Sequence, residues 1–282
     1  MNPPESTTAE PSASPSPEPV PESSVTPEPE KTAAPEFTFT PEPEATQTPS
    51  PTESIHITVG SGIYTVKNGK AVYQKPKKSA VAVTVPDTVK VDGKNVPVTA
   101  IEKGAFQNDG KLKTLTIGKN VTTIGDNAFT NCSRLSRVTI GKKVQKIGKA
   151  AFAGCGKLTT VRGGASVTSI GMNAFKKCVT LKTFPEMKKL TGIGTGAFDG
   201  CGKLTKFTIG SRVKSIGKNA FRNCRRLKTI TVKTTRLTAG NVKAGAFQAI
   251  YSKAVFKCPK SKRTAYQKLF AKRGAGKKCI YR

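Results

Sequence analysis

A strict 23-residue period is the feature that most constrains how this chain of 282 residues can fold. Six phenylalanines follow one another at this interval: Phe106, Phe129, Phe152, Phe175, Phe198 and Phe221. Five cysteines keep the same step, with Asp109 at the corresponding place in the first unit: Cys132, Cys155, Cys178, Cys201 and Cys224. The last unit carries an insertion, because the next Ala-Phe pair ends at Phe247, 26 residues after Phe221. A fixed period of this length predicts a solenoid with one supersecondary unit per repeat.

Each unit carries enough apolar residues for one coil of such a stack. The copy from Val121 to Gly141 reads Val-x-x-Ile-Gly-x-x-Ala-Phe-x-x-Cys-x-x-Leu-x-x-Val-x-Ile-Gly. Leu-x-x-Val-x-Ile is too short for a helix and predicts a short strand. We expect Val-x-x-Ile-Gly to turn the chain and Ala-Phe-x-x-Cys to return it as a helical or 3₁₀ turn. Coils stacked about 4.8 Å apart then bury their apolar side chains in a continuous column.

The repeat Ile-Gly-x-x-Ala-Phe-x-x-Cys-x-x-Leu-x-x-Val-x-Ile-Gly resembles the BspA-type leucine-rich repeat. It covers residues 98–232 in strict register, and flanking pieces extend the likeness to roughly 56–282. The resemblance implies an α+β solenoid of about six coils with short parallel strands, a β-rich N-terminal cap and a βαβ C-terminal cap. It also implies a secreted or surface-attached protein of a host-associated microbe, in a family of which a few members act as adhesins. Fold carries over from such a resemblance, but the ligand does not.

The sequence divides into four segments: a spacer over residues 1–55, an N-terminal cap over 56–97, repeats over 98–250 and a C-terminal cap over 251–282. In the N-terminal cap, Lys67-Asn68-Gly69 and Asp92-Gly93 predict hairpin turns. In the C-terminal cap we expect a strand over 255–259, a helix that Ser261 caps and that runs to about Arg273, and a final strand over 279–281.

Residues 1–55 differ in composition from everything that follows. They hold 14 of the 19 prolines, and ten Glu against one Lys. Such a segment buries too little apolar surface to offset chain entropy, so we expect a disordered, semi-rigid spacer. No positively charged and then apolar leader opens the chain, so the protein is either cytosolic or has lost a leader. The spacer favours the second alternative, with an extracellular or cell-surface location.

The composition of residues 56–282 argues against an enzyme. They carry 47 Lys and Arg against seven Asp and Glu, a net charge of +40. The single imidazole, His56, lies in the N-terminal cap, and the carboxylates are isolated in the sequence. A cysteine nucleophile needs a base within reach, and a zinc site needs ligand pairs such as Cys-x₂-Cys. We expect no catalysis, no metal and no cofactor, and no apolar run approaches the ~20 residues that span a bilayer.

The cysteines of the repeats are best explained as small buried apolar residues. Parallel stacking would give neighbouring thiols of this column poor disulfide geometry. Cys258 and Cys279 lie outside the column, on two strands that flank the predicted helix. A disulfide that closes the C-terminal cap therefore stays open as an alternative.

Two rows of cations follow the repeat register and flank the predicted strands. The residue before each strand's Leu is basic in five units of six, the exception being Thr180, and we name these five the leading row: Lys111, Arg134, Lys157, Lys203 and Arg226. The trailing row follows the strands: Lys119, Lys142, Lys143, Lys188, Lys189 and Arg212. The outward strand positions between the rows are largely Thr. Like charges this close repel, so stability alone would not select the leading row.

A Thr-rich sheet between two basic rows favours binding of an acidic partner. We expect a non-catalytic surface protein, most simply a monomer, that adheres to a host or neighbouring-cell protein or to an acidic glycan. Two alternatives stay open: the cations only aid solubility, or they retain the protein on the cell's own anionic wall polymer. Lys outnumbers Arg and the repeat's aromatic residues are expected in the core, which argues against specific nucleic-acid recognition.

Two central units depart from the strand pattern. In place of Val-x-Ile-Gly, one reads Val-Arg162-Gly-Gly and the next reads Phe-Pro185-Glu186-Met. Pro185 removes a donor from the strand ladder. Repeat decay is one explanation. The other is that Arg162 and Glu186 mark a notch in the binding face where a specific partner docks.

Overall fold

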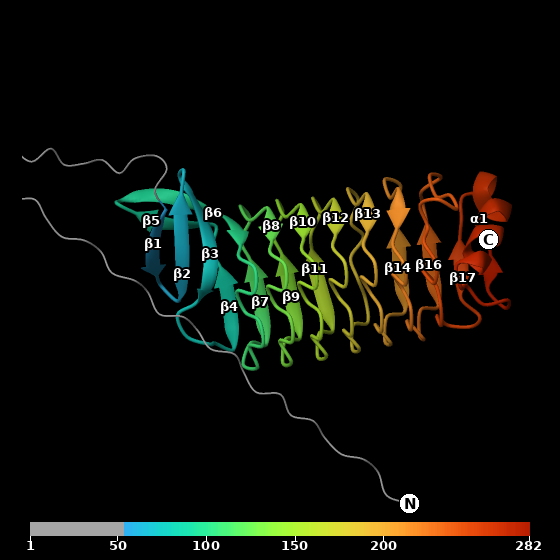
Figure 1. Cartoon of the computed structure of the whole chain (residues 1–282), viewed down its shortest axis with the longest axis horizontal. Helices are drawn as coiled ribbons and strands as arrows, with labels where there is room; N and C mark the ends of the chain where they lie inside the picture. The colour runs from blue at the N-terminus through green and yellow to red at the C-terminus, as the bar shows by residue number, and fades with distance from the viewer. Residues whose placement is uncertain (1–53) are drawn as a thin grey trace, which may run out of the picture. The chain divides into compact units, whose positions relative to one another are not determined.

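The computed structural model describes residues 54–282 (Figure 1). The disorder that we predict for residues 1–55 therefore lies outside the described residues, apart from the last two positions. The described residues form a stack of short parallel strands between a β-rich N-terminal cap and a helix-bearing C-terminal cap (Figure 1). This is the capped solenoid that the 23-residue period predicts.

The N-terminal cap consists of six strands: β1 (Ile55–Val59), β2 (Gly62–Lys67), β3 (Lys70–Pro76), β4 (Ala82–Val85), β5 (Thr88–Val91) and β6 (Lys94–Ile101). β1, β2 and β3 form an antiparallel meander, and β5 pairs antiparallel with β6. The turns at Asn68-Gly69 and Asp92-Gly93 have φ of 50° and 66°, and of 47° and 73°. Positive φ at both central positions is the type I′ geometry, which confirms the two predicted hairpins.

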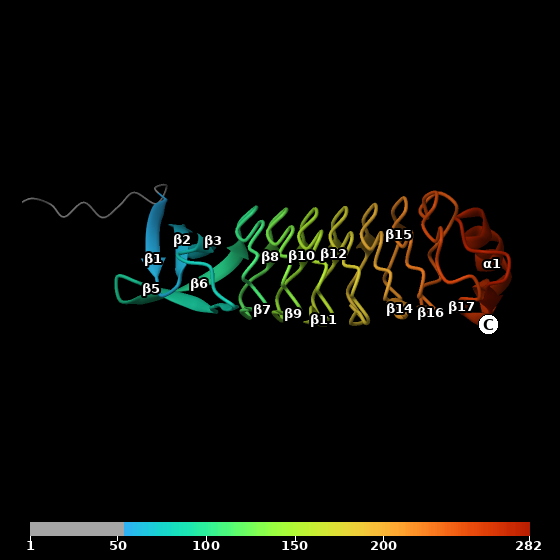
Figure 2. The ribbon, with the colours of Figure 1, turned by 90° about the horizontal axis from the view of Figure 1, so that it is seen from below.

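Two parallel ladders run along the repeats on different sides of the stack (Figure 2). The longer strands form what we name the Thr-rich face: β4, β7 (Thr114–Ile117), β9 (Arg137–Ile140) and β11 (Thr160–Gly163), then β14 (Lys206–Ile209), β16 (Thr229–Val232) and β17 (Val255–Lys257). Thr183 bridges Thr160 and Lys206, so the two halves are continuous. Burial alternates along these strands, which directs Val138 and Ile140 of β9 into the core and leaves Arg137 and Thr139 exposed.

The second ladder consists of two-residue strands that continue from β6: β8 (Thr123–Ile124), β10 (Lys146–Ile147), β12 (Ser169–Ile170), β13 (Gly192–Ile193) and β15 (Ser215–Ile216). Our expectation that Val-x-x-Ile-Gly only turns the chain was wrong. The constant repeat length places each Gly amide beside the Ile carbonyl of the preceding coil, as in the 2.9 Å bond from the Gly148 N–H to the Ile124 oxygen. These backbone bonds make the segment a strand.

The Ala-Phe-x-x-Cys segment returns through isolated i→i−3 turns, so the helical alternative was wrong and only single 3₁₀-type turns are present. Every second amide bonds to the neighbouring coil, as the Phe129 N–H does to the Ala151 oxygen at 2.8 Å. The amides between them bond to the residue three before, as the Thr130 N–H does to the Asn127 oxygen at 3.0 Å. One left-handed residue precedes the segment and one lies within it, here Asn127 with φ 56° and Asn131 with φ 59°. A regular helix excludes both features, because all its residues are right-handed and its amides form hydrogen bonds within the helix.

Two continuous columns fill the core of the repeats. The phenylalanine rings of the repeat register, from Phe106 to Phe247, stack with centroids 4.9–5.7 Å apart. Each column thiol donates to the carbonyl oxygen of the Phe 26 residues earlier, at 3.1–3.2 Å. The cysteines are fully buried and unbonded to one another, as the sequence predicts.

The two units that depart from the pattern keep a filled core. Thr183 makes single bridges where the other units have a strand. Phe184 points inward, with its ring centroid 5.1 Å from that of Phe175. Met187 is buried and reaches the backbone of Gly164 in the preceding coil. Met187 thus replaces the inward residue that the pattern loses.

The C-terminal cap is a βαβ unit: β17, a 3₁₀ turn η1 (Lys260–Lys262), helix α1 (Arg263–Lys272) and β18 (Ile280–Tyr281), which pairs parallel with β17. Tyr266 and Phe270 are the buried residues of α1. Ser261 does not cap this helix, so that prediction was wrong. Pro259 starts a separate 3₁₀ turn that contains Ser261, and α1 begins after Lys262 without a side-chain cap bond.

The strand register excludes the disulfide that the sequence left open. Val255 pairs with Ile280, and the Cys258 N–H bonds to the Arg282 oxygen, so Cys258 and Cys279 lie at opposite ends of neighbouring strands. Four residues of register separate them by about 13 Å at ~3.3 Å per residue. That is well beyond the ~7 Å between Cα atoms that a disulfide tolerates. Both are free thiols.

Candidate binding face

The leading row lies at one edge of the Thr-rich face. All five of its basic side chains are exposed. β7, β9 and β11 pair with partners 23 residues apart, so the register aligns Lys111, Arg134 and Lys157 on three successive coils. Adjacent coils are about 4.8 Å apart. The row is therefore a line of closely spaced ammonium and guanidinium groups in solvent.

The face between the two rows carries more positive charge than the sequence reasoning assigned to it. Arg137 and Lys206 are exposed at outward strand positions, as is Arg162. The sequence reasoning missed Arg137 and Lys206, although they share the repeat position of Thr114, Thr160 and Thr229. Comparison of the outward positions unit by unit, at the 23-residue step, would have found them.

The trailing row is exposed, but two of its members are engaged within the protein. Lys119 Nζ lies 3.0 Å from Asp87 Oδ2, and the Lys119 backbone N–H donates to Asp87 Oδ1. This backbone N–H, followed by the side-chain bond, holds the pKa of Asp87 below its ordinary value. Lys143 Nζ donates to Asn120 Oδ1 at 3.0 Å. The leading row, which has no such ion pairs among the described residues, is the better anion contact.

Arg162 and Glu186 form no ion pair with each other among the described residues. Glu186 accepts hydrogen bonds from Lys233, whose Nζ lies 2.9 Å from both carboxylate oxygens. Arg162 is exposed on β11 and forms no ion pair in the described part of the chain. A neutralised carboxylate and an unpaired guanidinium leave positive charge at this place.

Residues 54–282 assemble no recognisable catalytic or metal centre. No three of their His, Cys, Asp or Glu side chains gather closely enough to hold a metal ion. Burial raises the pKa of Cys178, Cys201 and Cys224 above the ordinary thiol value, which suppresses the reactive thiolate. His56 is exposed, with Nδ1 3.1 Å from Thr65 Oγ1. Within the described residues no helix has the length and apolar character needed to cross a membrane.

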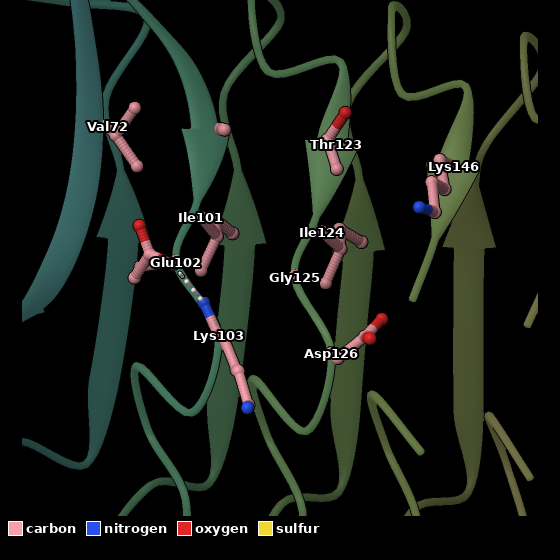
Figure 3. A pocket seen from close by; sticks show the side chains of 10 residues that line it. Val72, Ile101, Glu102, Lys103, Thr123, Ile124, Gly125, Asp126 and Lys146 are labelled. Carbon is pink, nitrogen blue, oxygen red and sulfur yellow. Dashed lines mark hydrogen bonds between the residues drawn. The ribbon is translucent and has the colours of Figure 1, made fainter. Parts of the chain in front are cut away.

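A hollow of about 350 Å³ lies on the second ladder, beside β3, β6, β8 and β10 (Figure 3). Its lining includes Glu102, Lys103, Asp126 and Lys146, so two carboxylates that look isolated in the sequence share one site. Backbone amides engage both: Glu102 accepts from the Lys103 N–H at 3.0 Å, and Asp126 from the Lys149 N–H at 2.7 Å. Balanced charges and carboxylates that are already bonded indicate no specific ligand.

These features define a class of protein: a capped solenoid of leucine-rich coils with a basic sheet face. A family model described as the BspA type leucine-rich repeat region, with six copies, matches residues 99–228 and 161–275. The chain therefore belongs to the BspA-type leucine-rich repeat family, as the repeat suggested.

Solved structures of bacterial leucine-rich repeat proteins are similar to this chain. A leucine rich cell surface protein of Faecalibacterium prausnitzii is 26% identical, covers 72% of this chain and 70% of its own, and has a TM-score of 0.54. A leucine-rich repeat protein of Eubacterium ventriosum is 26% identical over 69% of this chain and 50% of its own, with a TM-score of 0.58. One from Bacteroides ovatus, 24% identical over 73% and 59% with a TM-score of 0.59, shows the fold alone. No curated protein matches this sequence.

Proposed function

We propose that this protein is a non-catalytic binding protein, secreted or displayed at the cell surface, which adheres to a host or neighbouring-cell protein or acidic glycan through the Thr-rich face. The leading row is the observation that carries the proposal. Five exposed cations lie in one repeat register, where like charges repel and folding gains nothing from them. A partner with complementary negative charge relieves that repulsion on binding.

The surface location has support from the comparisons. The protein belongs to a repeat family with a cell surface protein among its structural neighbours, and that neighbour is 26% identical. The short Thr side chains allow a partner to approach the strands closely, and the flanking cations attract its negative charges. Binding of this kind needs no catalytic group. A monomer suffices for this role.

Retention on an anionic wall polymer is the second candidate. The net charge of +40 over residues 56–282 favours it, because a field of this size attracts any polyanion. Bulk attraction depends on total charge and little on where the charges lie. Reversing a charge on the Thr-rich face should therefore weaken specific adhesion more than reversing a charge elsewhere. Retention by bulk charge should respond equally to both changes.

A pair of double variants tests the position. Lys157→Glu with Lys203→Glu reverses two members of the leading row, and Lys146→Glu with Lys214→Glu reverses two exposed lysines away from the Thr-rich face. The total charge of the two proteins is the same. We expect the first to weaken capture of surface proteins at least about tenfold, roughly 1.4 kcal/mol, and the second to change it little.

The thermal midpoint of both proteins should stay near that of the wild type, because all four side chains are exposed and none forms an ion pair among the described residues. Equal loss in both variants would support retention by bulk charge. Equal capture by wild type and the leading-row variant would remove the leading row from the binding site.

A further inference from the structure

The positive charge of the protein is concentrated toward its C-terminal end. Residues 56–199 hold 24 Lys and Arg together with all seven Asp and Glu, whereas residues 200–282 hold 23 Lys and Arg and no acidic residue. The last carboxylate, Asp199, is buried and accepts two hydrogen bonds from the Arg222 guanidinium, at 3.1 and 2.8 Å. The other ion pair of residues 200–282 joins Lys233 to Glu186, so two carboxylates from the preceding part of the chain offset this charge among the described residues.

We name residues 251–282 the basic end-cap. They carry eleven cations, of which all but the half-buried Arg273 are exposed: Lys253, Lys257, Lys260, Lys262, Arg263, Lys268, Lys272, Arg273, Lys277, Lys278 and Arg282. They lie on β17, η1, α1 and the segments that adjoin these elements, and Figure 1 shows β17 and α1 at the end of the stack. None of the leading or trailing row belongs to this segment, which shares only β17 with the Thr-rich face.

The basic end-cap contains a groove of about 290 Å³. It runs between the inserted loop at Leu237 and Ala239 and the side of α1, where Leu269 contributes an apolar wall. Lys268 and Lys272 line the same groove. The groove therefore offers apolar contact beside a pair of exposed ammonium groups.

Arg273 fixes a third cation in the groove. Its Nε donates to the Val242 oxygen at 2.7 Å, and its Nη2 donates to the Ala239 oxygen at 2.8 Å. These bonds tie the inserted loop to the helix and hold the guanidinium in place, so little side-chain entropy is left to lose on binding. The groove is thus preorganised for an anion.

The chemistry of the end-cap fits a polysaccharide better than a membrane. Tyr266 and Phe270 of α1 are buried in the core and Leu269 is half-buried in the groove, which leaves the helix no broad apolar face for a bilayer. Ile280, 52% exposed, is the one exposed large apolar residue among residues 251–282. An acidic sugar polymer instead presents apolar ring faces and regularly spaced anions, which match an apolar groove flanked by lysines.

We propose that the basic end-cap is a second binding site, which takes an acidic polysaccharide along the groove between α1 and the loop at 237–239. This proposal adds a second site to the one proposed on the Thr-rich face and does not depend on that site. A chain held at its end by a glycan leaves the sheet side of the stack free for another partner.

The test uses the full chain and heparin as the probe, over a salt series. One variant replaces Lys268, Lys272, Lys277 and Lys278 by Gln. Its matched control replaces Lys67, Lys70, Lys90 and Lys94, four exposed lysines of the N-terminal cap, by Gln. Lys268 and Lys272 line the groove, and Lys277 and Lys278 add charge to the same end-cap. Each lost contact should lower the slope of log affinity against log salt by about 0.7, so we expect the end-cap variant to lose at least about 1.4 units of slope and at least about tenfold in affinity.

The control variant should bind heparin as the wild type does. Equal losses in the two variants, or no loss in either, would overturn the proposal. Binding to phosphatidylglycerol vesicles with no binding to heparin would also overturn it, in favour of a lipid surface. Lys157 and Lys203 are intact in the end-cap variant. Its result therefore does not affect the proposal for the Thr-rich face, which has a separate test.

Discussion

At the scale of single residues, the Ile-Gly glycines decide whether coils can stack. A Cβ built on Gly171 would lie 2.6 Å from the carbonyl carbon of Gly148, which real contacts do not show. The sequence shows this glycine in five successive units, from Gly125 to Gly217, but it does not give the distance between coils. The periodicity could therefore be predicted from the sequence, whereas the reason for the glycine needed the structure.

Two glycine substitutions test this close approach. Gly171→Ala should lower the free energy of unfolding by about 1–3 kcal/mol, because the methyl group forces neighbouring coils apart. Gly202→Ala is the matched control, since a Cβ there meets nothing within 4 Å and the backbone needs no positive φ. It should be neutral or slightly stabilising, by at most ~1 kcal/mol. Urea unfolding of both proteins measures the difference; equal effects would contradict the account.

At the scale of elements, structure that depends on local sequence was predictable, whereas structure that depends on pairing with a neighbouring coil was not. Asn68-Gly69 and Asp92-Gly93 specify their hairpins because positive φ at two adjacent positions is a property of those residues. The two-residue strands such as β8 carry no pattern of their own and exist only through bonds to a neighbouring coil. The same holds for the candidate site: the leading row follows from the repeat, but the Lys233–Glu186 pair does not.

The interrupted unit at Pro185 offers a test of repeat decay. Pro185→Thr supplies the missing amide, so decay predicts a new strand between β11 and β14 and a gain of about 0.5–1.5 kcal/mol in the free energy of unfolding. Thr208→Pro, at the same repeat position one unit later, should cost about 3 kcal/mol. Hydrogen exchange at residues 184–187 reports the strand directly. A loss of stability in Pro185→Thr would mean that proline fits a shaped break, and not a decayed repeat.

At the scale of the whole molecule, the thiol column couples stability to pH. Burial keeps Cys178, Cys201 and Cys224 protonated, and the neighbouring thiol of Cys132, followed by burial, raises the pKa of Cys155. The unfolded chain loses these protons above about pH 8.5. Native protein then binds more protons than unfolded protein, so stability is full below that pH and falls above it, by about 1.4 kcal/mol per pH unit for each thiol.

Urea unfolding between about pH 8 and pH 9.5 measures this slope. Cys178→Ala should reduce the slope of unfolding free energy against pH by the contribution of one thiol. This reduction distinguishes the cysteine column from other titrating groups. A slope that is unchanged in Cys178→Ala would show that the pH dependence comes from elsewhere.

The whole molecule also carries the central claim, that a shaped face and not total charge selects the partner. The most direct measurement is capture of host matrix proteins and acidic polymers by the full chain from low salt to about 1 M, where the Debye length falls to about 3 Å. The account predicts that at least one protein or glycan stays bound at high salt and is released by Lys157→Glu with Lys203→Glu. Binding to every polyanion alike, lost at moderate salt and indifferent to those two substitutions, would contradict it.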